Sequence, residues 1–190
     1  MGKSLGNTLE PNELVHNFGP DAVRYFFLKE VELVMMVTIR GPFYNIVNAH
    51  LANTIGNLLN HTLGLLRKNC KSTLVVDSAI AAEGTAFKDN VEKLGHYENL
   101  SLSSAREVVL EIGNAGNSYM DEEHHGHFLS MGVLLLKLQL RICNYLEAMR
   151  IIAVALSPVT PNLSWRTYEQ LGYSNDQFNC ATGSVSFSQK

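Results

Sequence analysis

The sequence predicts an all-α fold, a bundle of about five core helices that run mostly antiparallel. Apolar residues recur at three- and four-residue steps over long segments, which is the stripe of a helix that faces a core. Prolines open several of these segments and glycines follow their ends. Apolar residues make up 46% of the 190 residues and charged residues 17%, a globular rather than a disordered composition.

The N-terminal part predicts a loop followed by two short helices. Met1–Asn7 is short, polar and interrupted by glycine, as loops are. Pro11 and Gly19 bracket the first helix, PNELVHNF. Pro20 opens the second, PDAVRYFFLKEVE, and places Asp21 in its first turn, where the helix dipole favours a negative charge.

A long helix is predicted from Tyr44 to about Lys68, after a segment of different character. Leu33–Phe43 is β-branched and rich in methionine, lacks a helical period and ends at Gly-Pro, so we expect a short strand or an irregular link. Polar Asn57 and His61 lie off the apolar stripe of the long helix. That stripe consists of Ile46, Val47, Leu51, Ile55, Leu58, Leu59, Thr62, Leu65 and Leu66.

Three further helices are predicted in the second half of the chain. Ser101 or Ser103 caps a helix that carries apolar and small residues on one side. Val133–Leu156 is a long helix that ends before a Ser-Pro pair, because the residue before proline avoids the α region. Pro161–Leu171 follows, with Gly172 just after its end, where glycine is favoured.

The composition excludes several classes of protein. A formal net charge of -3 argues against a broadly basic nucleic-acid-binding protein, although a local RNA-reading face does not need a basic pI. Cys70, Cys143 and Cys180 stand far apart, so neither a disulfide framework nor a cysteine zinc site is predicted, and a reducing compartment fits best. Charged residues interrupt the longest apolar stretch, Met131–Leu156, at about 2.5–3.5 kcal/mol each near a bilayer centre, so we expect a buried helix of a soluble bundle.

Three blocks of sequence, in order along the chain, resemble one enzyme family. The first, MGKSLGN, resembles the Lys-Met-Ser-Lys-Ser loop of class I aminoacyl-tRNA synthetases, with the first lysine missing and Gly2 in place of a serine. EPNELVHNFGPDAVRYFFLKEVE continues as that family does. LANTIGNLLNHTLGLLRK, Leu51–Lys68, resembles the first anticodon-domain helix of methionyl-tRNA synthetases, and the patterns between Leu156 and Gly172 match their last helices. The blocks look most like the bacterial-type methionyl enzymes of plant organelles.

The resemblance implies a division of the chain into three parts. Residues 1–42 would be the end of a catalytic domain, with an ATP loop and a remnant that contacts the tRNA stem. Residues 43–175 would form the helical anticodon-binding domain of class I synthetases, and residues 176–190 a loose tail. The family further implies ATP as cofactor, a methionine tRNA as partner and a plastid or mitochondrial location. Neither a metal, a membrane nor DNA is expected.

The N-terminal loop carries the first candidate site. Such enzymes let a carboxylate attack the α-phosphorus of ATP, so a mobile ammonium and hydroxyl donors stabilise the leaving pyrophosphate. The resemblance makes Lys3 that cation and Ser4 a second donor, on a loop that closes over the nucleotide. The alternative is a solvated terminus with an ordinary surface lysine. Since the family's nucleotide fold lies upstream and no strand–helix alternation here replaces it, we expect the chain itself to be unable to aminoacylate.

The long helix carries the second candidate site. Asn57 and His61 are four residues apart and share one helix face. In the family this face reads anticodon bases through an Asn and an Arg, so Asn57 matches and His61 replaces the bidentate guanidinium. Tyr119–Asp121 matches the third-helix motif, but the stacking tryptophan that should follow is absent. Phe128 is a possible substitute, whereas Trp165 is expected to pack at the bundle edge. The alternative for the Asn–His pair is a surface of solvated side chains.

Two clusters, one rich in histidine and one basic, can each be interpreted either as a binding site or as ordinary surface residues. The histidines of segment 124–127 could bind a transition metal, but a solvated loop is the simpler interpretation because no cysteine accompanies them. Arg67, Lys68 and Lys71 could contact tRNA phosphates or could simply be cations at the C-terminal end of a helix.

These features lead to one function with two alternatives. The chain is expected to be the C-terminal part of a methionine–tRNA ligase, the enzyme that charges tRNA with methionine for translation. The alternatives are a non-catalytic helical module that binds tRNA or another protein, and an inert fragment.

Overall fold

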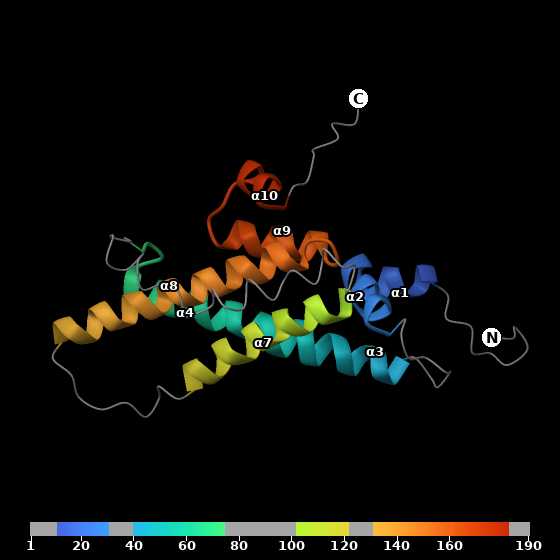
Figure 1. The fold of residues 1–190 in the computed structure, drawn as a ribbon, viewed down its shortest axis with the longest axis horizontal. Helices are drawn as coiled ribbons and strands as arrows, with labels where there is room; N and C mark the ends of the chain where they lie inside the picture. The colour runs from blue at the N-terminus through green and yellow to red at the C-terminus, as the bar shows by residue number, and fades with distance from the viewer. Residues whose placement is uncertain (1–10, 31–39, 75–101, 122–130, 183–190) are drawn as a thin grey trace, which may run out of the picture.

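A computed structural model describes residues 11–30, 40–74, 102–121 and 131–182, and every regular element in these ranges is a helix (Figure 1). The all-α prediction is confirmed. Among the helices described, none is long and apolar enough to cross a membrane. The elements are α1 Pro11–Phe18, α2 Pro20–Glu30, α3 Arg40–Ile46, the wider π-type helix η2 Val47–Gly56, α4 Asn57–Cys70, α7 Leu102–Asp121, α8 Met131–Leu156, α9 Pro161–Gln170 and α10 Asn175–Thr182.

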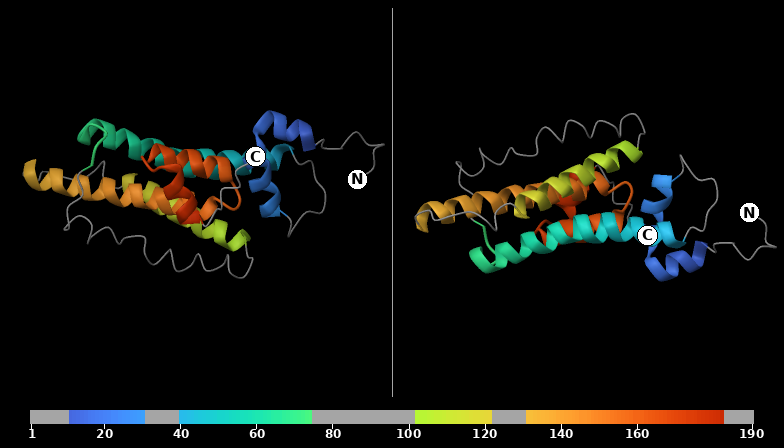
Figure 2. Two further views of the ribbon diagram at one scale, coloured as in Figure 1. Left: turned by 90° about the horizontal axis from the view of Figure 1, so that it is seen from above. Right: turned by 90° about the horizontal axis from the view of Figure 1, so that it is seen from below.

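Three long elements form the body of the bundle. α3, η2 and α4 follow one another without a break, and the resulting rod lies beside α7 and α8 (Figure 2). α9 packs along α8, and α10 packs on both. α1 and α2 gather at one end, next to the start of the rod (Figure 1). The predicted helices from Val133 and Pro161 are therefore confirmed, and the one predicted from Tyr44 to Lys68 is found within α3, η2 and α4.

The main core lies where the rod, α7 and α8 meet. Leu58 from α4, Ile112 from α7 and Met149 from α8 are each fully buried. Burying such a side chain contributes about 1.5–3 kcal/mol, so the apolar stripes predicted from the sequence supply the main driving force for this packing. A smaller cluster joins Ala153 of α8, Tyr168 of α9 and Phe178 of α10.

Two glycines end helices as predicted. Gly19 follows α1 with a φ of 78°, and Gly172 follows α9 with a φ of 91°. Both are in the left-handed region, which a residue with a Cβ enters only at a steric penalty.

α2 is bound tightly to the turn between α8 and α9. The Arg24 guanidinium donates through Nε to the Val159 carbonyl (2.9 Å) and through Nη2 to the Pro158 carbonyl (2.8 Å). About one helical turn before Arg24 on α2, the Asp21 carboxylate accepts from the backbone N–H of Leu163, in the first turn of α9. α2 thus places a cation on the carbonyls of the turn that follows α8 and an anion on the amide end of α9, where the helix dipole favours negative charge.

Two predictions about the secondary structure are wrong in part. The expected strand or link at Leu33–Phe43 is overturned for Arg40–Phe43, which form the start of α3; residues 31–39 lie outside the described residues. Pro42 fits there because the first turn of a helix needs few backbone N–H groups. Phe43 is buried against Phe18 and Phe26, with ring centroids 4.9 and 5.1 Å away, and this packing outweighs the local pattern.

The loose tail expected at residues 176–190 is the second correction, because Asn175–Thr182 form α10; residues 183–190 lie outside the described residues. The Gln177 side chain accepts from the Ser174 backbone N–H (2.8 Å), and the Gln177 N–H donates to Ser174 Oγ (3.3 Å). This reciprocal pair is a capping box, which stabilises a helix start. Phe178 then buries its ring 5.2 Å from that of Tyr168.

Candidate nucleic-acid interface

One face of α4 is fixed in the core and the opposite face is open to solvent. Leu58 and Thr62 are buried, and the Thr62 hydroxyl donates to the Leu58 carbonyl at 2.7 Å, so no polar atom of that side chain is left unsatisfied. Asn57, Asn60 and His61 are all exposed. The sequence prediction that Asn57 and His61 occupy the solvent side of this helix agrees with the structure, while their role stays a prediction.

Small residues on α7 let the rod pack closely, through Thr54 of η2 and Leu58 of α4. A Cβ on Gly113 would lie 2.8 Å from Thr54 Cγ2, and one on Gly116 would lie 2.9 Å from Leu58 Cδ1. Both glycines therefore permit a close approach that a larger residue would allow only if the Thr54 or Leu58 side chain shifted. The Asn117 side chain adds a hydrogen bond from Nδ2 to the Thr54 carbonyl (3.0 Å). The exposed face of α4 consequently stands on a rigid support, which is what base recognition requires.

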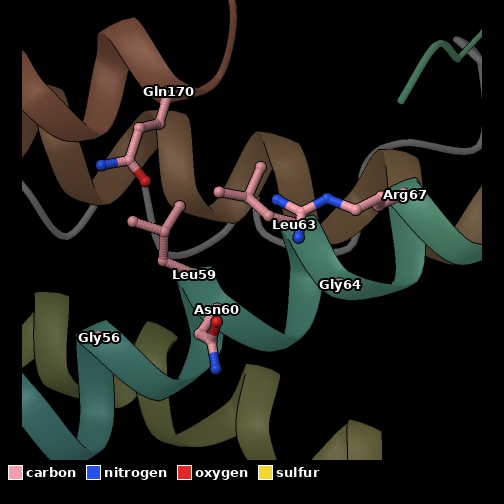
Figure 3. A pocket seen from close by; sticks show the side chains of 7 residues that line it. All are labelled: Gly56, Leu59, Asn60, Leu63, Gly64, Arg67 and Gln170. Atoms are coloured by element: carbon pink, nitrogen blue, oxygen red, sulfur yellow. The ribbon is translucent and has the colours of Figure 1, made fainter. Parts of the chain in front are cut away.

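A hollow of about 320 Å³ opens beside this face, between α4 and the end of α9 (Figure 3). Gln170 reaches across from α9 toward Leu59, and Arg67 lies back along α4 toward Leu63 (Figure 3). The hollow is lined by Gly56, Leu59, Asn60, Leu63, Gly64, Arg67 and Gln170. It combines an apolar wall with two amides and one guanidinium.

The end of α4 carries three exposed cations, Arg67, Lys68 and Lys71. Lys71 caps the helix in the left-handed conformation with a φ of 50°, and its N–H donates to the Leu66 carbonyl. Glycine is the usual residue at such a position. The cations lie near the last carbonyls of the helix, where positive charge is favourable whether or not RNA is bound.

Several predicted site residues cannot be placed. Lys3, Ser4, the histidines of segment 124–127 and Phe128 lie outside the described residues. Within the described ranges, no three His, Cys, Asp or Glu side chains come together in a way that could hold a metal ion. Trp165 packs its ring 5.6 Å from that of Phe178, so the prediction that it is a packing residue at the bundle edge is confirmed.

Sequence reasoning missed Gly64 and Gln170 as neighbours of the candidate face. Gly64 did carry a signal, because a glycine inside a strongly periodic helix needs a reason. Gln170 carried none, since its position beside α4 depends on how α9 packs.

The chain is similar to methionine–tRNA ligases along almost its whole length. The chloroplastic/mitochondrial methionine–tRNA ligase of Arabidopsis thaliana is 63% identical over 97% of this chain and 31% of its own length. The methionine–tRNA ligase of Synechocystis is 37% identical over 93% of this chain and 34% of its own length. The family model described as tRNA synthetases class I (M) matches residues 1–63.

A solved structure shows the same fold. The Mycobacterium tuberculosis methionyl-tRNA synthetase in complex with methionyl-adenylate superposes with a TM-score of 0.73 at 23% identity, over 96% of this chain and 38% of that one. The chain spans about a third of the length of the curated relatives that it matches. The similarity in sequence, together with the shared fold, shows that the chain belongs to the methionyl-tRNA synthetase family.

Proposed function

We propose that this chain is the part of an organellar methionine–tRNA ligase that binds the anticodon loop of a methionine tRNA. The observation that supports the proposal best is the exposed face of α4, which presents Asn57 and His61 from a rigid support. Anticodon bases are unstacked and are read on their edges by such polar side chains. The chloroplastic/mitochondrial relative favours a plastid or mitochondrial location.

The two side chains would contribute unequally. The amide of Asn57 offers a donor and an acceptor to one base edge. The imidazole of His61 is shorter than a guanidinium and cannot make its forked pair of hydrogen bonds. We therefore propose that Asn57 supplies most of the selectivity on this face and that the matched loop is preferred only modestly.

The N-terminal segment would take part in the ATP chemistry of the complete ligase. Lys3 and Ser4 would contact the pyrophosphate of ATP in the complete ligase, since the similarity to the family includes this segment. The two residues would stabilise negative charge on the leaving oxygens. The regular elements of the described residues are all helices, and the nucleotide fold would lie in another part of the ligase.

The test is a titration of the chain with RNA hairpins that carry matched or mismatched methionine anticodon loops. Asn57→Ala should weaken the matched complex about tenfold, the loss of one good base contact, and leave the mismatched complexes nearly unchanged. Asn175→Ala is the matched control, because Asn175 is exposed at the start of α10, a helix that stands apart from α4 (Figure 1). His61→Arg should strengthen the matched complex.

Two results would count against the proposal. Equal weakening of all hairpins by Asn57→Ala would indicate a general surface rather than an anticodon site. Absence of RNA binding would favour an inert fragment or a module that binds another protein.

A further inference from the structure

The hollow between α4 and α9 has the composition of a binding site for a flat, polar-edged ring. Leu59 and Leu63 form its apolar wall, and Leu59 itself packs on the main core, so the wall is fixed. Gln170 and Arg67 place an amide and a guanidinium at the rim (Figure 3). No lining residue is acidic. A volume of about 320 Å³ suits one small ligand.

Gly64 supplies an independent observation. Its backbone is helical, and a Cβ added there would meet nothing within 4 Å, so neither a left-handed turn nor close packing explains the glycine. Gly113 and Gly116, by contrast, are explained by contacts under 3.0 Å. A glycine inside a helix is unfavourable relative to alanine. Gly64 instead leaves space beside Leu63, and a side chain at position 64 would narrow the hollow.

We infer that this hollow binds one unstacked base of an RNA loop. The inference rests on the proposed function, and it adds a second base-binding position beside the Asn57 face. The base would lie over Gly64 against the leucine wall. The Gln170 amide would pair with the base edge, because an amide offers both a donor and an acceptor, and Arg67 would contact the adjoining phosphate.

The surroundings of the hollow favour a nucleobase over a purely apolar ligand. Asn60 lines the hollow and lies one residue from His61 on the exposed face, so an RNA strand on that face passes the rim. Lys68 extends the positive charge of Arg67 along the same end of α4. Apolar side chains such as Leu59 and Leu63 can pack against the face of an extruded base, and positive charge beside them attracts the neighbouring phosphates.

The experiment combines protein variants with RNA lacking single bases. Hairpins with one abasic nucleotide at each loop position in turn are titrated against the wild-type chain and against Gly64→Leu, which fills the hollow. Some abasic positions will cause no further loss in Asn57→Ala, because Asn57 contacts the missing base. At one other position, removing the base should weaken binding to the wild-type chain about tenfold. In Gly64→Leu the intact hairpin should already bind about tenfold more weakly, and that same abasic position should cause no further loss.

Three further variants separate the causes. Gln170→Ala should reproduce the effect of Gly64→Leu at the same loop position. Ala181→Leu adds an equal apolar side chain to an exposed site on α10, which contributes nothing to the hollow, and should bind like the wild type. Gly64→Ala should melt at a higher temperature than the wild type, which shows that the glycine is not required for folding.

The outcomes distinguish this inference from the proposed function. If Asn57→Ala weakens binding but no abasic position is coupled to Gly64→Leu, the base pocket is rejected and the anticodon function stands. If no hairpin binds the wild-type chain, both are rejected. If Ala181→Leu weakens binding as much as Gly64→Leu, the effect is general and the pocket is again rejected.

Discussion

Individual side chains show how the surroundings tune ionisable groups. Burial, and secondarily the negative charge of Glu147, raises the pKa of the Cys143 thiol above its ordinary value of 9.0. Burial also raises the pKa of Tyr173 above 10.0, partly opposed by the charge of Arg150. Arg150 donates to both oxygens of Glu147, at 2.6 and 2.7 Å, and this bond raises the pKa of the guanidinium. The folded chain therefore favours the neutral thiol and phenol.

These shifts predict a loss of stability at alkaline pH. In the unfolded chain Cys143 releases its proton near its ordinary pKa of 9.0, whereas the folded chain retains it to higher pH. Its contribution is thus complete below that pH and declines as pH rises through the folded pKa. Urea midpoints measured between about pH 8 and pH 10 should fall less steeply for Cys143→Ala than for the wild type. Cys180→Ala, an exposed control, should follow the wild type, and an identical slope in all three would contradict the prediction.

At the scale of elements, α2 stabilises the turn between α8 and α9 and the start of α9 through contacts that its own sequence does not predict. Thr160 precedes α9 but makes no capping hydrogen bond, and Pro161 has no N–H to satisfy. Asp21, 142 residues before Leu163, takes over that role by accepting from the Leu163 N–H. The start of α9 is thus capped by another helix, and Arg24 binds the same turn from the carbonyl side.

Removing this cap should destabilise the fold. Asp21→Ala should lower the free energy of unfolding by about 1–2 kcal/mol, the usual effect of losing an N-terminal cap, whereas Asp21→Asn should restore most of it. Asp176→Ala is the matched control, because Asp176 is exposed in the first turn of α10 and should matter by only about 0.3–1 kcal/mol. Denaturant unfolding of Asp21→Ala, Arg24→Ala and the double variant should show a smaller loss for the pair than the two losses added. Strict additivity would argue against a shared role.

At the scale of the whole molecule, the sequence predicted what depends on local pattern. Pro161 and Gly172 marked the ends of α9, and the apolar stripe placed Asn57 and His61 on the outside of α4. What depends on distant partners could not be predicted. Phe43 is helical because it packs against Phe18 and Phe26, and Gln170 reaches the candidate site only because α9 docks on α8.

The start of α10 depends on a local pattern and yet was not predicted. Ser174 and Gln177 form a capping box that can be read from the sequence spacing alone, and it was missed because the segment is polar. The π-type stretch η2 is a different case. Apolar residues at steps of four, such as Val47, Leu51 and Ile55, fit an ordinary helix as well as a wider one.

The overall charge of the chain leads to the last prediction. The chain has a formal net charge of -3, so under the proposed function we expect the basic end of α4 to supply a large part of the attraction to RNA. Each phosphate that a cation neutralises contributes about -0.7 to the slope of log affinity against log salt for single strands. Lys68→Gln with Lys71→Gln should therefore reduce the slope by about 1.4 and weaken matched and mismatched hairpins alike. Asn57→Ala should do the reverse, leaving the slope unchanged while removing the preference for the matched loop. If the double lysine variant altered selectivity but left the slope unchanged, the prediction would be wrong, and these cations would stabilise the C-terminal end of α4 rather than bind phosphates.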